Sequence, residues 1–224
     1  MNGHATPDLV IFDCDGVLVD SEIVAARVMA EELTALGFEM TPEGCIARYT
    51  GISMPAVIAR IEEERGRPLP AGFAEHLRDR DAEAFRTELR SIEGVAEMLA
   101  ALSLPRCVAS SGRLAKMRLT LSLTGLLPLL EPHLFSAEQV ARGKPAPDLF
   151  LFAAARMGFA PDTCVVVEDS LPGVAAAVAA GMTALGFVGG GHCGPEHAAA
   201  LREAGAARVF SRMADLRGLL TAAT

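Results

Sequence analysis

The alternation of short apolar runs with helical segments, from about Ile92 to the C-terminus, does most to restrict the fold of this chain. Strands are predicted at residues 106–109, 134–136, 164–167, 183–188 and 208–210, and helices at 94–102, 114–123, 147–157, 172–180, 195–204 and 213–220. Repeated β-α units of this kind favour a parallel sheet with helices on both faces. The apolar run at residues 8–12 predicts one more buried strand. We therefore expect a Rossmann-like, three-layer α/β core.

The segment at residues 20–89 interrupts this alternation. Its pattern is helical throughout, with charged clusters such as Glu62–Arg65 and breaks at glycines and prolines, and it contains no predicted strand. We expect a core domain formed by residues 1–19 and 90–224, and an inserted all-helical cap domain at residues 20–89. An insertion after the first strand belongs over the carboxyl edge of the sheet, where open α/β sheets bind ligands.

The composition argues against two classes of partner. The formal net charge is −8, the pI is about 5.2, and only 5% of the residues are aromatic, so no nucleic-acid partner is expected. The most apolar stretch, residues 171–188, is broken by Pro172, Gly173 and Gly181. It predicts a buried helix followed by a strand, and not a membrane span.

The cysteines and the N-terminus bear on the compartment. The chain has 5 cysteines and no C-x-x-C pair, which favours free thiols in a reducing environment. The first residues show no signal-peptide pattern. We expect a cytoplasmic protein that is a monomer or a weak homo-oligomer.

Two carboxylates directly follow the first predicted strand. Asp13 and Asp15 flank Cys14, and Gly16 allows the chain to turn there. One carboxylate could attack phosphorus while the other carries a proton. A solvated acidic turn is the plainer alternative, and a calcium loop is disfavoured because Val17 and the apolar residues after it stand where further ligands would be needed.

Polar residues also follow the predicted strand at 106–109. Ser110, Ser111 and Arg113 precede a predicted helix, whose free backbone N–H groups could hold phosphate oxygens. Arg113 could reach the rest of a substrate. Taken alone, the segment is equally typical of a serine that caps a helix.

Two later segments carry charge of opposite sign. Lys144 lies between Gly143 and Pro145 in a stiff loop, where an ammonium group could neutralise phosphate or orient a nucleophile. Glu168 and Asp169 end another buried apolar run, and hard oxygen ligands at a sheet edge suit Mg²⁺. An ordinary surface lysine and a helix cap remain the alternatives. All four segments together, in this order and all at the carboxyl ends of strands, favour the functional interpretation.

These residues resemble the four signatures of the haloacid dehalogenase superfamily. The longer strings IFDCDGVLVDSE, GKPAPD and VVVEDSLPGV are similar to the branch that contains β-phosphoglucomutase and small sugar phosphatases, and in particular to the 6-phosphogluconate phosphatases. The resemblance covers essentially the whole chain, including the helical insertion.

The resemblance implies a mechanism. Asp13 would attack phosphorus and form an aspartyl-phosphate, and Asp15 would protonate the leaving oxygen and then activate water. Mg²⁺ would be held by Asp13, the backbone carbonyl of Asp15 and Asp169, with Glu168 nearby. Ser110 and Lys144 would hold the phosphoryl group. An acid at position 15 favours phosphoryl transfer over dehalogenation, because a halide leaves without a proton.

We therefore expect a Mg²⁺-dependent phosphatase that acts on a small phosphorylated metabolite, such as a sugar or sugar-acid phosphate. A sugar-phosphate mutase is the alternative enzyme, although the first helix of the insertion lacks the histidine found in β-phosphoglucomutase. A sensor that binds a sugar phosphate without catalysis is the alternative from another class. The loop at residues 189–197 holds two histidines and Cys193, but its spacing matches no usual zinc site, and we expect a flexible loop there.

Overall fold

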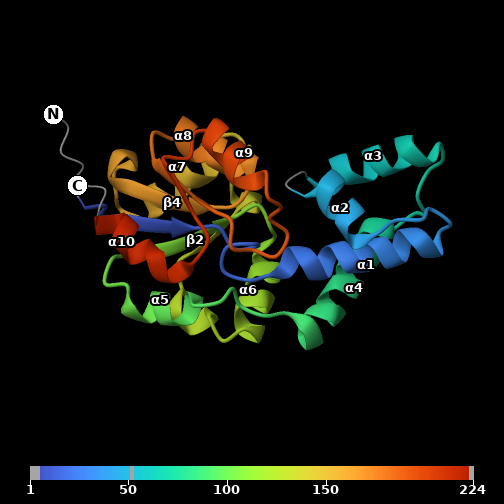
Figure 1. Cartoon of the computed structure of the whole chain (residues 1–224), viewed down its shortest axis with the longest axis horizontal. Helices are drawn as coiled ribbons and strands as arrows, with labels where there is room; N and C mark the ends of the chain where they lie inside the picture. The colour runs from blue at the N-terminus through green and yellow to red at the C-terminus, as the bar shows by residue number, and fades with distance from the viewer. Residues whose placement is uncertain (1–5, 51–52, 222–224) are drawn as a thin grey trace. The chain divides into compact units, whose positions relative to one another are not determined.

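Among the residues that the structure describes, six parallel strands form one sheet (Figure 1). They are β1 (Leu9–Phe12), β2 (Arg106–Ser110), β3 (Leu134–Ser136), β4 (Cys164–Glu168), β5 (Thr183–Phe187) and β6 (Arg208–Phe210), and their order in the sheet is β3-β2-β1-β4-β5-β6. The computed structural model describes residues 6–50 and 53–221. The prediction of an α/β fold with a parallel sheet is confirmed.

Helices cover both faces of this sheet. The helices α7 (Asp148–Met157), α8 (Leu171–Ala179) and α9 (His197–Glu203) lie over one face in Figure 1, and α5 (Val95–Ala101), α6 (Leu114–Leu123) and α10 (Leu216–Thr221) lie along the other. Side chains alternate between the faces of a strand, so Leu9 and Ile11 of β1 point to one face and pack with Ala153 of α7 and Val174 of α8. Every residue of β1 is buried, as expected for a strand covered on both sides.

The described chain divides into two compact units. One consists of Met1–Asp20 and Arg90–Thr224 and contains the sheet, and the other is Ser21–Leu89. The described residues of the second unit form the helices α1 (Ser21–Ala35), α2 (Pro42–Tyr49), α3 (Met54–Arg65) and α4 (Phe73–Glu88). It has its own apolar core, in which Leu33, Ile61 and Leu77 are almost fully buried. No helix in the described ranges combines the length and apolar character needed to cross a membrane.

Several predicted boundaries differ from the structure. The strand predicted at residues 164–167 extends to Glu168, whose side chain is fully buried. The helix predicted at 195–204 begins at His197, because the chain first makes a turn in which the N–H of His197 donates to the carbonyl of Gly194. The helix predicted at 213–220 begins with a separate 3₁₀ turn at Met213–Asp215.

Candidate active site

The acidic residues of the candidate site follow two neighbouring strands. Phe12 at the end of β1 is in register with Val167 in β4, and the backbone N–H of Asp13 donates to the Val167 carbonyl at 3.0 Å. The strand order changes direction between β1 and β4, and the crevice outside such a point is where open α/β sheets bind ligands. Asp13 and Asp169 therefore leave adjacent strands at the same edge of the sheet.

Lys144 joins two of these acids. Its Nζ atom lies 2.6 Å from Oδ1 of Asp13 and 2.5 Å from Oε1 of Glu168. The lysine side chain is 3% exposed and the Glu168 side chain is fully buried, so solvent screens these ion pairs little. Although burial disfavours the ammonium form, its two carboxylate partners raise the pKa of Lys144 above its ordinary value. Lys144 is therefore a fixed positive charge in the site.

The carboxyl group of Asp13 lies among other acids. Burial raises its pKa well above the ordinary value, and Lys144 acts against this shift. Repulsion from Glu168, Asp169 and Asp15 raises the pKa of Asp13 further. The sheet edge is therefore a place where negative charge is crowded, and a bound cation would relieve the repulsion.

Both carboxylate oxygens of Glu168 have partners. Oε1 binds Lys144, and Oε2 accepts hydrogen bonds from the backbone N–H of Ser170 at 2.7 Å and from its hydroxyl group at 2.9 Å. The Ser170 hydroxyl also caps α8 by accepting from the N–H of Gly173 at 3.1 Å. This arrangement favours Glu168 as the group that orients Lys144. Its predicted role near a metal ion stays a prediction.

The first turn of α8 packs so closely against the Glu168 carboxylate that it has no room for a side chain at Gly173. A Cβ atom at Gly173 would lie 1.8 Å from Oε1 of Glu168, whereas a Cβ atom at Gly218, in α10, would meet nothing within 4 Å. We predict that Gly173→Ala lowers the free energy of unfolding by about 1–3 kcal/mol, because it displaces the Glu168 carboxylate. Gly218→Ala is the matched control and should raise it by about 0.5–1 kcal/mol, the ordinary gain of alanine in a helix.

Chemical denaturation of both alanine variants beside the wild type checks this prediction. Equal stabilisation in the two variants would show that the carboxylate of Glu168 does not occupy the observed position.

Asp169 lies against the loop that follows β1. A Cβ atom at Gly16 would be 1.9 Å from Oδ2 of Asp169, and Gly16 has a φ of +77°, a conformation that glycine adopts easily. The same Oδ2 atom is 3.0 Å from Nε2 of His192, in the loop after β5. Burial raises the pKa of Asp169, and the hydrogen bond from His192 lowers it. Burial lowers the pKa of His192, but the bond to Asp169 outweighs this and raises it to about 11.

Asp15 is paired with a lysine that sequence analysis missed. Nζ of Lys116, in α6, lies 2.9 Å from Oδ1 of Asp15. A Cβ atom at Gly112 would be 3.3 Å both from Oδ2 of Asp15 and from the hydroxyl oxygen of Ser110, so these two polar groups lie close to the same loop. The Ser110 hydroxyl accepts from the N–H of Gly112 at 3.0 Å. The Ser136 hydroxyl, also missed, donates to the carbonyl of Gly112 at 2.7 Å and fixes the loop.

Two other predicted residues lie differently. The guanidinium group of Arg113 binds Glu138 at 2.8 Å and its side chain is 64% exposed. Glu138 also accepts from the N–H of Leu114, so it holds the start of α6 together with Arg113. Ser111 is exposed. The structure thus brings Asp13, Lys144, Glu168 and Asp169 together at one buried edge, while it directs Arg113 to a surface ion pair.

This arrangement suits chemistry on an anionic group. Carboxylates can act as nucleophile and as proton carrier, and a buried ammonium group can stabilise negative charge. Such a site at the carboxyl edge of a parallel α/β sheet is typical of a hydrolase that acts on phosphate esters.

Comparison with known proteins defines the family. A family model described as haloacid dehalogenase-like hydrolase matches residues 7–181. The chain is 34% identical to the 6-phosphogluconate phosphatase of Escherichia coli over 189 residues, which cover 84% of this chain and 86% of that protein. It is 34% identical to hexitol phosphatase A of the same organism, over 76% of this chain and 78% of that protein.

A solved structure agrees with these matches. It is a hydrolase of the same family from Deinococcus radiodurans, with bound phosphate and sodium. It is 38% identical, has a TM-score of 0.83 and covers 98% of this chain and 97% of that chain. The chain belongs to the haloacid dehalogenase-like hydrolase family. The phosphatases among its relatives confirm the prediction of a phosphatase.

Proposed function

We propose that the chain hydrolyses a sugar or sugar-acid phosphate in a Mg²⁺-dependent reaction that passes through an aspartyl-phosphate on Asp13. The observation that carries this proposal is the buried contact of Lys144 with Asp13 and Glu168, beside Asp169 at the switch point of the sheet. Phosphoryl transfer needs a nucleophile, a fixed positive charge and a second acid close to one another.

The donor atoms fit Mg²⁺. Asp13 and Asp169 offer carboxylate oxygens and Asp15 offers its backbone carbonyl oxygen, and oxygen atoms are the ligands that Mg²⁺ prefers. The close approach of Gly16 to Oδ2 of Asp169 shows that the loop after β1 reaches the end of β4. Asp13, Asp169 and the backbone carbonyl of Asp15 would hold the ion, with Glu168 nearby. When bound, Mg²⁺ would neutralise charge on the phosphoryl oxygens and on the crowded acids.

The residues of this chain then have separate tasks. Asp13 attacks phosphorus with a carboxylate oxygen, and Lys144 holds that carboxylate in place and favours its ionised form. Lys144 also contributes positive charge next to the transferring phosphoryl group, and the Ser110 hydroxyl can donate to one of its oxygens. Asp15 protonates the leaving alkoxide and later takes a proton from the attacking water. Lys116 orients the Asp15 carboxylate for these steps.

The substrate class rests on the relatives. Those reported above act, by name, on a phosphorylated sugar acid and on hexitol phosphates. Both kinds of substrate are small polyhydroxy compounds that carry one phosphate group. Because the chain has a net negative charge, its surface as a whole does not attract a phosphate group. The phosphate must therefore be bound locally, by Lys144 and a bound cation.

A substrate panel tests the proposal. We predict that the purified protein releases inorganic phosphate from 6-phosphogluconate, hexitol phosphates or hexose phosphates when Mg²⁺ is present, and that a chelator abolishes the release. Formation of an isomer without phosphate release would replace the phosphatase with a mutase. Thermal stabilisation by one of these compounds without any turnover would replace it with a sensor.

A further inference from the structure

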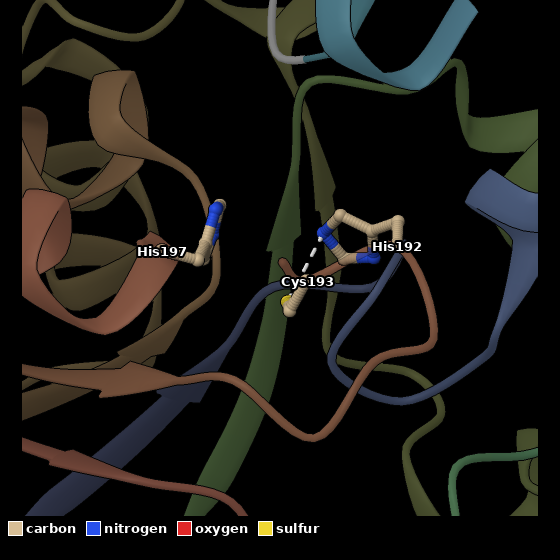
Figure 2. Close-up of side chains that lie close together, drawn as sticks. All are labelled: His192, Cys193 and His197. Carbon is tan, nitrogen blue, oxygen red and sulfur yellow. Dashed lines mark hydrogen bonds between the residues drawn. The ribbon is translucent and has the colours of Figure 1, made fainter. Parts of the chain in front are cut away.

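The loop after β5 and the start of α9 bring three potential metal ligands together. His192 and Cys193 lie in the loop, and His197 is the first residue of α9. One ligand atom from each of these residues lies within 4.8 Å of the other two, and in the part of the chain that the structure describes no other group of this kind occurs. Figure 2 shows the hydrogen bond between Cys193 and His192, with the His197 ring across from them. We propose that these three residues form a site for Zn²⁺, separate from the proposed Mg²⁺ ligands.

The geometry is close to that of a zinc site. Zn–S and Zn–N bonds of about 2.3 Å and 2.0–2.1 Å give a sulfur-to-nitrogen separation of about 3.6 Å in a tetrahedral site. The Sγ atom of Cys193 lies 3.5 Å from Nε2 of His192. The two rings meet edge to face, with centroids 5.8 Å apart. The three ligand atoms lie within 4.8 Å of one another, so a local adjustment of these side chains would bring all three to bonding distance from one ion.

The donor set selects against Mg²⁺. A thiolate and two imidazoles suit Zn²⁺, whereas Mg²⁺ takes oxygen ligands. A cysteine binds a metal ion as the thiolate, and two histidines beside Cys193 complete a donor set of sulfur and nitrogen. Nδ1 of His192 is buried and has no hydrogen-bond partner among the described residues, so the ring is not fully satisfied as it stands.

Asp169 connects the two metal sites. Its carboxylate binds Nε2 of His192 at 3.0 Å, and its backbone carbonyl lies 2.5 Å from Nε2 of His197. An ion bound to Nε2 of His192 would replace the proton that this ring shares with Asp169, and the hydrogen bond that orients the Asp169 carboxylate would be lost. We therefore expect Zn²⁺ to slow the phosphatase. This consequence rests on the proposed function, but the binding of Zn²⁺ does not.

Binding is measured directly, with Co²⁺ as a coloured substitute for Zn²⁺. The wild-type protein in excess Mg²⁺ should bind one equivalent of Co²⁺ and show the near-ultraviolet charge-transfer band of a thiolate ligand, and Zn²⁺ should displace the ion. Cys193→Ser should remove the band, and Cys193→Ser and His197→Gln should each weaken Zn²⁺ binding by at least about 10–100-fold in a competition assay with a chelator. His133→Gln, which changes an exposed histidine in the same unit, should leave both unchanged.

The possible outcomes separate the two proposals. A charge-transfer band that persists in Cys193→Ser, or Zn²⁺ affinity that is equal in all variants, would contradict the site. So would loss of binding when Mg²⁺ is added, because the ion would then occupy the acidic edge. Thermal unfolding of each variant shows whether it is folded, and His197→Gln keeps the test decisive if Cys193→Ser does not fold. If Zn²⁺ binds but no phosphoester is hydrolysed, the zinc site stands and the proposed function fails.

Discussion

Asp13→Asn should lower the rate of Mg²⁺-dependent phosphate release by at least about 10³-fold, because removal of a covalent nucleophile costs more than removal of most other catalytic groups. The amide keeps the size of the carboxylate but cannot form an acyl phosphate with the substrate. Its nitrogen also cannot accept the hydrogen bond that Lys144 now donates to Oδ1. The effect should appear in kcat with every substrate that the wild type accepts, and a steady-state phosphate assay measures it.

Asp8→Asn is the matched control for this variant. Asp8 directly precedes β1, as Asp13 directly follows it, but its side chain is exposed. The same change of charge there should leave kcat within about two-fold of the wild type, as expected for a surface substitution. Comparable turnover in Asp13→Asn and Asp8→Asn would remove Asp13 from the reaction.

Lys144→Met should be the most destabilising single change in the candidate site. It leaves the carboxylates of Asp13 and Glu168 buried without their shared cation, and breaking a buried ion pair in this way costs about 3–5 kcal/mol. Methionine keeps an apolar stem of similar length beside Phe150, whose ring centroid lies 4.9 Å from the ammonium nitrogen. The measured loss therefore reports the charge more than the packing. Phosphatase activity should be lost as well.

The loss of stability in Lys144→Met should depend on pH in a definite direction. Lys144 lowers the pKa of Asp13 in the folded protein, so its removal raises a pKa that is already above the ordinary value. An acid whose pKa is raised in the folded state lowers the free energy of unfolding when it is ionised. This effect is absent below the pKa of the unfolded chain, about 4, and it grows as the pH rises above that value. The difference between wild type and variant should grow from pH 4 to pH 8.

Urea unfolding at several pH values measures this difference, and Arg142→Met is the control. Arg142 stands two residues earlier in the same loop and pairs with Asp148, but its side chain is 71% exposed. Its loss should leave the free energy of unfolding close to that of the wild type at every pH, because an exposed ion pair contributes little. A difference for Lys144→Met that stays constant across the pH range would mean that ionisation of Asp13 does not carry the effect.

The strands were predictable because the sheet is covered on both faces. Runs such as Val165–Val167 have no polar residue to place in water, so the sequence indicates burial directly. The end of β4 was missed for the opposite reason. Glu168 is charged, and a charged residue is typical of a loop, but Lys144 and Ser170 bind its carboxylate and allow it to be buried in the strand. The boundary depends on a partner that is distant in the sequence.

The candidate site was predictable where a short motif carries the chemistry. Asp13, Lys144 and Asp169 follow local patterns at the ends of strands or in a stiff loop. Lys116 has no such pattern, because it is one charged residue on a helix, and only the path of α6 brings it to Asp15. His192 and His197 looked like residues of a flexible loop for the same reason, since nothing in their spacing reveals that both contact Asp169.

The most direct test of the central claim is to trap the covalent intermediate. The protein is mixed with Mg²⁺ and a phosphoester that it hydrolyses, quenched in acid and treated with borohydride, which reduces an aspartyl-phosphate to homoserine. Mass spectrometry of the peptides then locates the modified residue. The mechanism predicts homoserine at position 13, and only when substrate and Mg²⁺ were both present. Homoserine at position 15 or 169, or turnover with no modified aspartate, would contradict it.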